Sequence, residues 1–118
     1  MNTNIEREIC RFVHETKRLG AGTWQRLFCF PPDFIGFAGH FPGQPVLPAV
    51  VQICMVRLFW SDVVSPVDSL DVISAKFLKP LLPDQEIMVN LSGEKAEFLV
   101  SGEKVSMLRI RPCPSTRV

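Results

Sequence analysis

His40 is the residue of this sequence best suited to chemistry at neutral pH. An imidazole has an unperturbed pKa of about 6.5, so it can accept and return a proton in the physiological range. His40 lies in the segment GHFPGQPVLP (39–48), whose prolines and glycines can hold the ring in a fixed position. The pattern favours a general base, although an isolated histidine beside Phe41 and Pro42 is more often a structural residue.

The next segment, PAVVQICMVRLFWS, predicts a helix over residues 48–61. Pro48 suits the first turn of this helix because its missing N–H group would have no partner there. Before the last residue only Gln52 and Arg57 are polar, and a helix that is apolar on nearly all sides is normally buried. The N-terminus of the helix offers free backbone N–H groups and a positive dipole end to a developing negative charge.

The segment GHFPGQPVLPAVVQICM (39–55) resembles the active-site signature of the hotdog-fold β-hydroxyacyl-acyl-carrier-protein dehydratases, the FabA/FabZ type. A second stretch, AKFLKPLLPDQEI (75–87), is similar to the strand–proline–turn–strand element that borders the substrate tunnel in that family. The resemblance covers residues 28–93 and looks closest to the compact dehydratase-like proteins of aryl-polyene and related pathways. The residues that match the family's spacing are His40, Phe41, Pro42, Gly43, Pro45 and Pro48.

The resemblance implies a hydro-lyase that removes water from a 3-hydroxyacyl chain held on acyl carrier protein by phosphopantetheine. In such an enzyme His40 would act as the general base. Ala49 falls at the position of the thioester-binding amide, where the family usually has glycine, so the backbone donor is kept and a methyl group is added. The residues expected to bind substrate are Phe41, Gly43, Val46, Ala49 and Gln52. We predict no cofactor and no metal.

The general acid of the family is missing. The family places Glu or Asp fourteen residues after the histidine, and here that residue is Cys54. A thiol has a reference pKa of about 8.5 against about 4.3 for Glu, and losing general-acid help typically costs a factor of about 10²–10⁴ in rate. Asp62 lies two turns further along the helix, and Asp33 and Asp68 are candidates only by default.

Three interpretations therefore remain open. The chain is a dehydratase that uses Cys54, Gln52 or a water as its acid, or it is a partner subunit of a homologue that carries the carboxylate. The second is possible because the resembling enzymes are dimers in which each site combines the histidine of one chain with the acid of the other. The third is a non-catalytic acyl-binding hotdog module. An acyl thioesterase is less favoured because it too would normally need a helix carboxylate, and Cys54 as a nucleophile is disfavoured by its apolar helix.

The composition of the chain limits the classes of partner that we expect it to bind. The 118 residues carry a formal net charge of +1 and fit one domain, 1–118, with no electrostatic reason to propose nucleic acid or an anionic membrane. No apolar run reaches the roughly 20 residues of a membrane span, and the four cysteines lack C-x-x-C spacing, so we expect a cytoplasmic chain with reduced thiols. Lys76 and Lys79 are either solvated or positioned to meet an acidic carrier or its phosphate.

The elements predict an α+β hotdog fold, in which an antiparallel sheet of five or six strands wraps one long central helix. Residues 4–17 suit either a helix or a strand, and residues 31–47, with four prolines and three glycines, predict a long irregular loop. Strands follow the helix, with hairpin turns at 93–95 and 102–104. Because such a sheet leaves an edge strand and a helix flank open, we expect a homodimer or a heterodimer with a homologous subunit.

Overall fold

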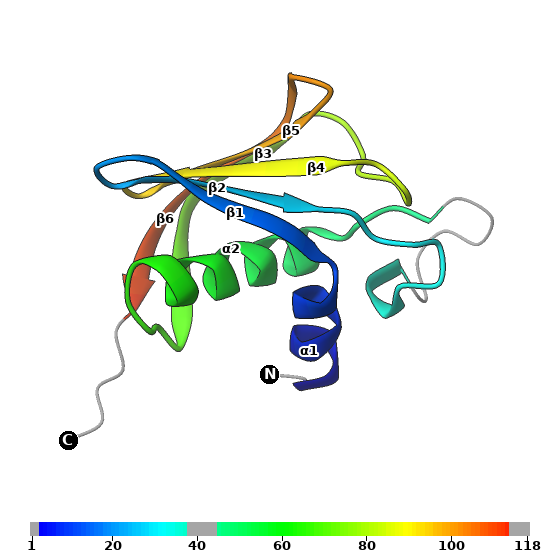
Figure 1. The fold of residues 1–118 in the computed structure, drawn as a ribbon, viewed down its shortest axis with the longest axis horizontal. Coiled ribbons are helices and arrows are strands. Elements are labelled where there is room, and N and C mark those ends of the chain that lie inside the picture. Colours follow the sequence, from blue (N-terminus) through cyan, green and yellow to red (C-terminus); the bar gives the residue numbers. More distant parts are fainter. Residues whose placement is uncertain (1–2, 38–44, 114–118) are drawn as a thin grey trace.

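The computed structural model describes residues 3–37 and 45–113 and contains the predicted antiparallel sheet around a central helix (Figure 1). The six strands are ordered β1-β2-β4-β5-β6-β3. Helix α2 lies on the concave side of the sheet, and α1 lies below it in this view. The elements are α1 Thr3–Arg11, β1 Val13–Gly20, β2 Thr23–Phe28, η1 Ile35–Phe37, α2 Ala49–Val63, β3 Ser69–Phe77, β4 Ile87–Ser92, β5 Lys95–Val100 and β6 Glu103–Cys113.

The N-terminal segment, which the sequence left open between helix and strand, contains both. Helix α1 ends at Arg11, whose guanidinium pairs with Glu8 one turn earlier at 2.9 Å. The chain then turns directly into β1, and the backbone N–H of Phe12 donates to the carbonyl of Ile9 at the junction. Ile9 is fully buried, so α1 is held to the core by its apolar side.

Helix α2 forms the centre of the core, as its apolar sequence predicts. Met55, Val56 and Phe59 are completely buried beneath the sheet. The prediction of burial fails at the N-terminal end, where Ala49 is exposed and Val50 is 69% exposed. No helix of the described residues is long and apolar enough to cross a membrane.

Strands β4, β5 and β6 form a meander, with β3 paired to β6 at the sheet edge, and the meander's turns differ slightly from those expected. The β4–β5 hairpin turns at Gly93 and Glu94, as predicted. The β5–β6 turn lies one residue earlier than predicted, at Ser101 and Gly102, with φ of 52° and 81°. Two consecutive positive φ angles match the twist of the flanking strands, which is why this two-residue turn replaces a longer one.

The two edges of the sheet differ in character. Strand β1 carries charged residues along its exposed length, among them Glu15, Lys17 and Arg18. Strand β3 is as exposed as β1 and carries Asp71 and Lys76, but it also presents three large apolar side chains, Val72, Ile73 and Phe77. Charged side chains protect an edge from pairing with other chains, whereas an apolar edge invites it.

The segment after β2 is not wholly irregular, which corrects one expectation. It contains the short helix η1, and stacked rings of Phe30 and Phe34, with centroids 4.3 Å apart, fix it to the core. A Cβ built on Gly36 would lie 2.3 Å from Cε2 of Phe34, so only glycine fits beneath the ring. The flank of the His40 loop is therefore held firmly up to Phe37, which is buried.

Candidate functional site

A pocket of about 370 Å³ lies between the N-terminal end of α2 and the end of β3. It brings together three residues that the sequence nominated for substrate binding, Val46, Ala49 and Gln52. The nominated residues His40, Phe41 and Gly43 lie outside the described residues. The full lining is Val46, Leu47, Pro48, Ala49, Gln52, Phe77, Leu78, Lys79 and Pro80, which includes no carboxylate.

Backbone hydrogen bonds hold the two walls of this pocket together. The N–H of Leu47 donates to the carbonyl of Leu81 at 2.9 Å, which ties the segment before α2 to the segment after β3. The N–H of Leu78 donates to the carbonyl of Val105 at 2.9 Å, which ties the end of β3 to β6. Leu47 and Leu81 are both buried, so the pocket is attached to the core and not to a free loop.

The start of α2, where Ala49 lines the pocket, provides unused backbone donors. The carbonyl of Pro48 accepts from the N–H groups of Val51 and Gln52, both at 3.1 Å. The N–H groups of Ala49 and Val50 donate to no described residue, and no side chain caps the helix. Together with the positive end of the helix dipole, these donors suit a carbonyl oxygen that gains negative charge. The methyl group of Ala49 does not remove them.

Gln52 is the polar side chain that reaches the pocket from within the helix. It is only 4% exposed, and its Nε2 donates to the carbonyl of Leu47 at 3.2 Å. Its Oε1 is buried and has no donor among the described residues. A buried oxygen without a donor is unfavourable, so Oε1 is an acceptor for any hydroxyl group or water that gains access to it.

Cys54, at the position where the resemblance leads us to expect the general acid, does not line the pocket. Two residues along a helix correspond to a rotation of about 200°, so Cys54 and Gln52 lie on different sides of α2. Cys54 is 5% exposed, and burial raises the pKa of its thiol although the nearby Arg57 guanidinium opposes the shift. The thiol therefore stays protonated at neutral pH.

Next to Cys54 lies an ion pair that sequence reasoning missed. Arg57 Nη2 is 3.8 Å from the sulfur of Cys54 and 3.0 Å from Oε2 of Glu6 on α1. Placing Glu6 here required knowing that residues 3–11 form a helix, which the sequence left undecided. The candidate acid Asp62 is engaged elsewhere, because it pairs with Arg26 at 3.0 Å.

The two lysines near Pro80 have different surroundings. Lys79 lines the pocket and pairs with Glu103 at 2.7 Å, with both side chains largely exposed. Lys76 lines a separate pocket on the opposite face of the sheet, described below.

Comparison with solved structures identifies the class of fold as the hotdog. A chain of the dehydratase heterocomplex ApeI:P from Xenorhabdus doucetiae superposes with a TM-score of 0.77 at 21% identity, covering 86% of this chain and 96% of that one. The GphF dehydratase P1711L variant gives 0.62 at 14% identity, covering 86% and 43%. An HP0420 homologue from Helicobacter felis gives 0.54 at 16% identity, covering 96% and 93%.

The sequence also matches the ApeI-like family, described as ApeI dehydratase, over residues 16–108. The chain belongs to the ApeI-like dehydratase family. No match was found among the curated proteins.

Proposed function

We propose that this chain is one subunit of a dehydratase that acts on 3-hydroxyacyl chains carried by acyl carrier protein. The observation that carries the proposal is the pocket at the start of α2. It offers unused backbone donors and the buried Gln52 oxygen, yet its described lining includes no carboxylate. A site that can bind and polarise a thioester but lacks an acid is completed by a second subunit that supplies one.

In this proposal His40 removes the proton from the carbon next to the thioester carbonyl. The helix donors stabilise the oxygen that gains charge. The hydroxyl group on the next carbon then takes a proton from the partner's carboxyl and leaves as water, and a double bond forms between the two carbons. Gln52 accepts a hydrogen bond from the departing hydroxyl or from the water.

Two findings support a partner subunit. The apolar edge of β3 ends at Phe77 and Leu78, which line the pocket and are both exposed, so a chain paired with this edge would close the pocket wall. The structural neighbour ApeI:P is a dehydratase heterocomplex. A carboxylate-bearing hotdog subunit is therefore the proposed partner.

The test is dehydration of a 3-hydroxyacyl carrier thioester, followed by mass spectrometry for loss of water. We expect little turnover from the chain alone and full turnover after a carboxylate-bearing homologue is added. His40→Ala in this chain should then abolish the turnover at the site to which it contributes. Unchanged total turnover with His40→Ala would refute the catalytic role of this chain, and binding of the acyl carrier without turnover in any mixture would favour an acyl-binding module.

A second variant tests whether the isolated chain lacks only the general acid or lacks the capacity for dehydration altogether. Cys54→Glu restores the family's residue type at this position. Turnover by the isolated variant would show that a carboxyl group at position 54 is sufficient when two copies of this chain pair, because one copy would supply the other with the general acid that is worth a factor of about 10²–10⁴. The matched control is Cys54→Gln, which has nearly the same shape but cannot donate a proton as an acid.

A further inference from the structure

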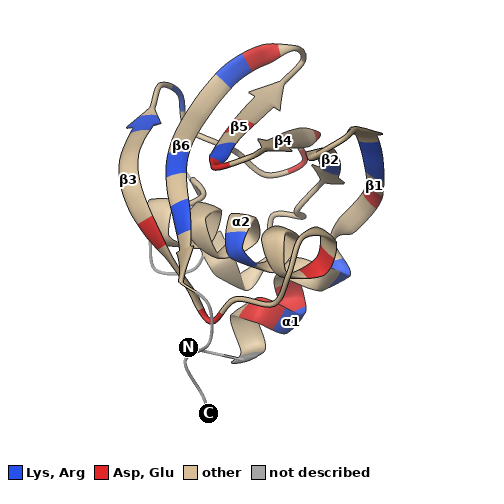
Figure 2. Ribbon diagram, turned by 90° about the vertical axis from the view of Figure 1, so that its left-hand side faces the viewer, with Lys and Arg blue, Asp and Glu red and all other residues tan. Residues whose placement is uncertain are grey.

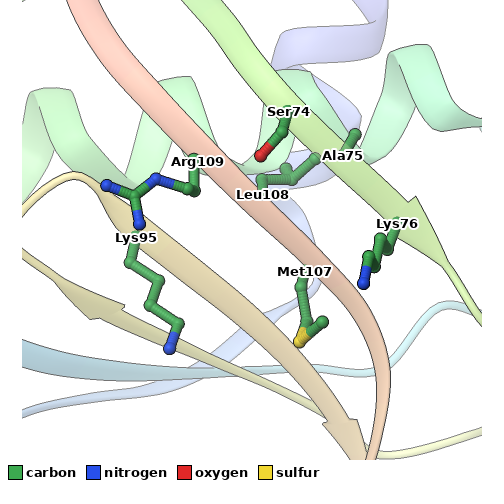
Figure 3. A pocket seen from close by; sticks show the side chains of 7 residues that line it. All are labelled: Ser74, Ala75, Lys76, Lys95, Met107, Leu108 and Arg109. Atoms are coloured by element: carbon green, nitrogen blue, oxygen red, sulfur yellow. The ribbon is translucent and has the colours of Figure 1, made fainter.

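The outer face of the sheet, on the side away from α2, carries a second pocket of about 330 Å³ (Figure 3). It is formed by three neighbouring strands, β3, β6 and β5. Its lining is Ser74, Ala75, Lys76, Lys95, Met107, Leu108 and Arg109. The lining therefore contains three cationic side chains and one hydroxyl group, with no carboxylate.

The register of the strands places two of these cations against each other. Lys95 on β5 lies directly opposite Arg109 on β6, and both are exposed on the same face. Like charges in directly opposite positions destabilise a sheet. In the paired strands of the described residues this is the only pair of like charges, whereas Arg111, two residues along β6, lies opposite Asp71.

Nearby carboxylates compensate this charge only in part. Glu97 Oε2 is 2.9 Å from the Nζ of Lys104 and 3.5 Å from the Nζ of Lys95, so one carboxylate is shared between two lysines. Neither Lys76 nor Arg109 forms an ion pair with any described residue. In Figure 2, separate blue segments mark the cationic residues along β6 and near the end of β3.

Figure 3 shows how the side chains are disposed. Lys76 and Lys95 lie on either side of Met107, and Arg109 extends toward Lys95. Ser74, which is opposite Arg109 in the β3–β6 register, adds a hydroxyl donor to the same row. A guanidinium, two ammonium groups and a hydroxyl form the donor set that binds the oxygens of a phosphate group.

We propose that this pocket is a phosphate-binding site, in which a phosphate group relieves the repulsion between Lys95 and Arg109. The inference does not depend on the proposed dehydration, because the pocket lies on the other face of the sheet from α2. It applies to inorganic phosphate and to phosphate monoesters alike, since both present the same oxygens to the site.

The test uses inorganic phosphate with the full chain, at constant ionic strength set with chloride. We expect saturable shifts of the Arg109 side-chain N–H signals in NMR, and a rise in the thermal unfolding midpoint because phosphate binds the folded state. Arg109→Gln should weaken phosphate binding about tenfold, in line with the loss of a charged hydrogen bond. The same variant should unfold at a higher temperature than the wild type in chloride alone, because the repulsion is gone.

Arg111→Gln is the matched control, since it removes one arginine of the same strand that does not line the pocket. It should bind phosphate like the wild type and should not gain stability in chloride. Equal responses to phosphate in Arg109→Gln and Arg111→Gln would overturn the proposal, as would the absence of saturable shifts at Arg109. Titrations with glycerol 3-phosphate and with glycerol decide whether the bound phosphate group belongs to a phosphate ester or to the free ion. Binding of the ester but not of glycerol assigns the site to phosphorylated molecules, and binding of inorganic phosphate alone assigns it to the free ion.

Discussion

Gln52 and Cys54 are two residues apart on α2, and their surroundings give them different roles. Gln52 lines the pocket and has a buried side-chain oxygen with no donor among the described residues, whereas the thiol of Cys54 is buried beside Arg57 on another side of the helix. The residue at the expected acid position is thus not the polar residue of α2 that lines the pocket within this chain.

Substitution of Gln52 tests this assignment. Gln52→Leu keeps most of the side-chain volume but removes the free acceptor, so we expect dehydration by the assembled enzyme to fall by about tenfold or more. Stability should change by no more than about 1 kcal/mol, because the lost bond to Leu47 is offset by removal of an unpaired buried oxygen. The control is Gln25→Leu on β2, which removes an amide that pairs with Asn90 outside the pocket. Equal losses of rate in the two variants would contradict the role of Gln52.

The thiol of Cys54 makes the free energy of unfolding depend on pH, and the sign of this dependence follows from its raised pKa. Burial raises its pKa above the ordinary value of a thiol in the folded chain, so the folded state holds the thiol proton more tightly than the unfolded state does. The stabilisation is fully present below the ordinary value and is lost as the pH rises above it. In urea titrations under reducing conditions, Cys54→Ala should therefore lose less stability than the wild type between neutral and alkaline pH. Parallel curves for the two proteins would show that the thiol titrates alike in both states.

At the scale of the elements, the segment before the His40 loop depends on one glycine. Gly36→Ala would force the Phe34 ring to move from its stack on Phe30, and overpacking of this kind typically destabilises by about 1–3 kcal/mol. Gly20→Ala is the matched control, because a Cβ there would meet no atom within 4 Å. Urea unfolding of both variants measures the difference, and equal stabilities would show that the ring can move freely.

The β5–β6 turn offers a stabilising change. Ser101 adopts a φ of 52°, which is unfavourable for most residues but is well tolerated by asparagine. Ser101→Asn should therefore raise the free energy of unfolding by about 0.5–1 kcal/mol. Chemical denaturation checks the change. A decrease in stability would indicate that the serine is held there by a contact other than the turn.

The elements that the sequence predicted well are those with a strong local pattern. The apolar run after Pro48 predicted the C-terminal end of α2 to within two residues. The glycines between the later strands predicted the turns of the β4–β5–β6 meander. The sequence could not decide between helix and strand before Gly20, because a short mixed segment suits both. For that reason the sequence could not predict the ion pair between Glu6 and Arg57. It could not predict the proposed phosphate-binding pocket either, because that pocket depends on the register between strands, which the pattern of a single strand does not reveal.

At the scale of the whole molecule, the two sheet edges predict where a partner binds. Ile73 on β3 and Leu19 on β1 are almost equally exposed, at 53% and 52%. Ile73→Lys should abolish the assembly, because it places a charge on the apolar edge, while Leu19→Lys should leave the assembly intact. Size-exclusion chromatography with light scattering measures the outcome, and unfolding of each isolated variant shows that the chain still folds. Loss of assembly with Leu19→Lys alone would place the partner on the other edge.

The apolar edge of β3 also affects how long an unpaired copy of this chain persists. A copy that has not found its partner exposes Val72, Ile73 and Phe77 on a strand whose outer backbone groups have no neighbour in the sheet. Such a copy is open to aggregation and to proteolysis, whereas a paired copy is protected from both. If the proposed partner subunit exists, surplus copies of this chain are removed in this way, and the scarcer of the two subunits sets the amount of both.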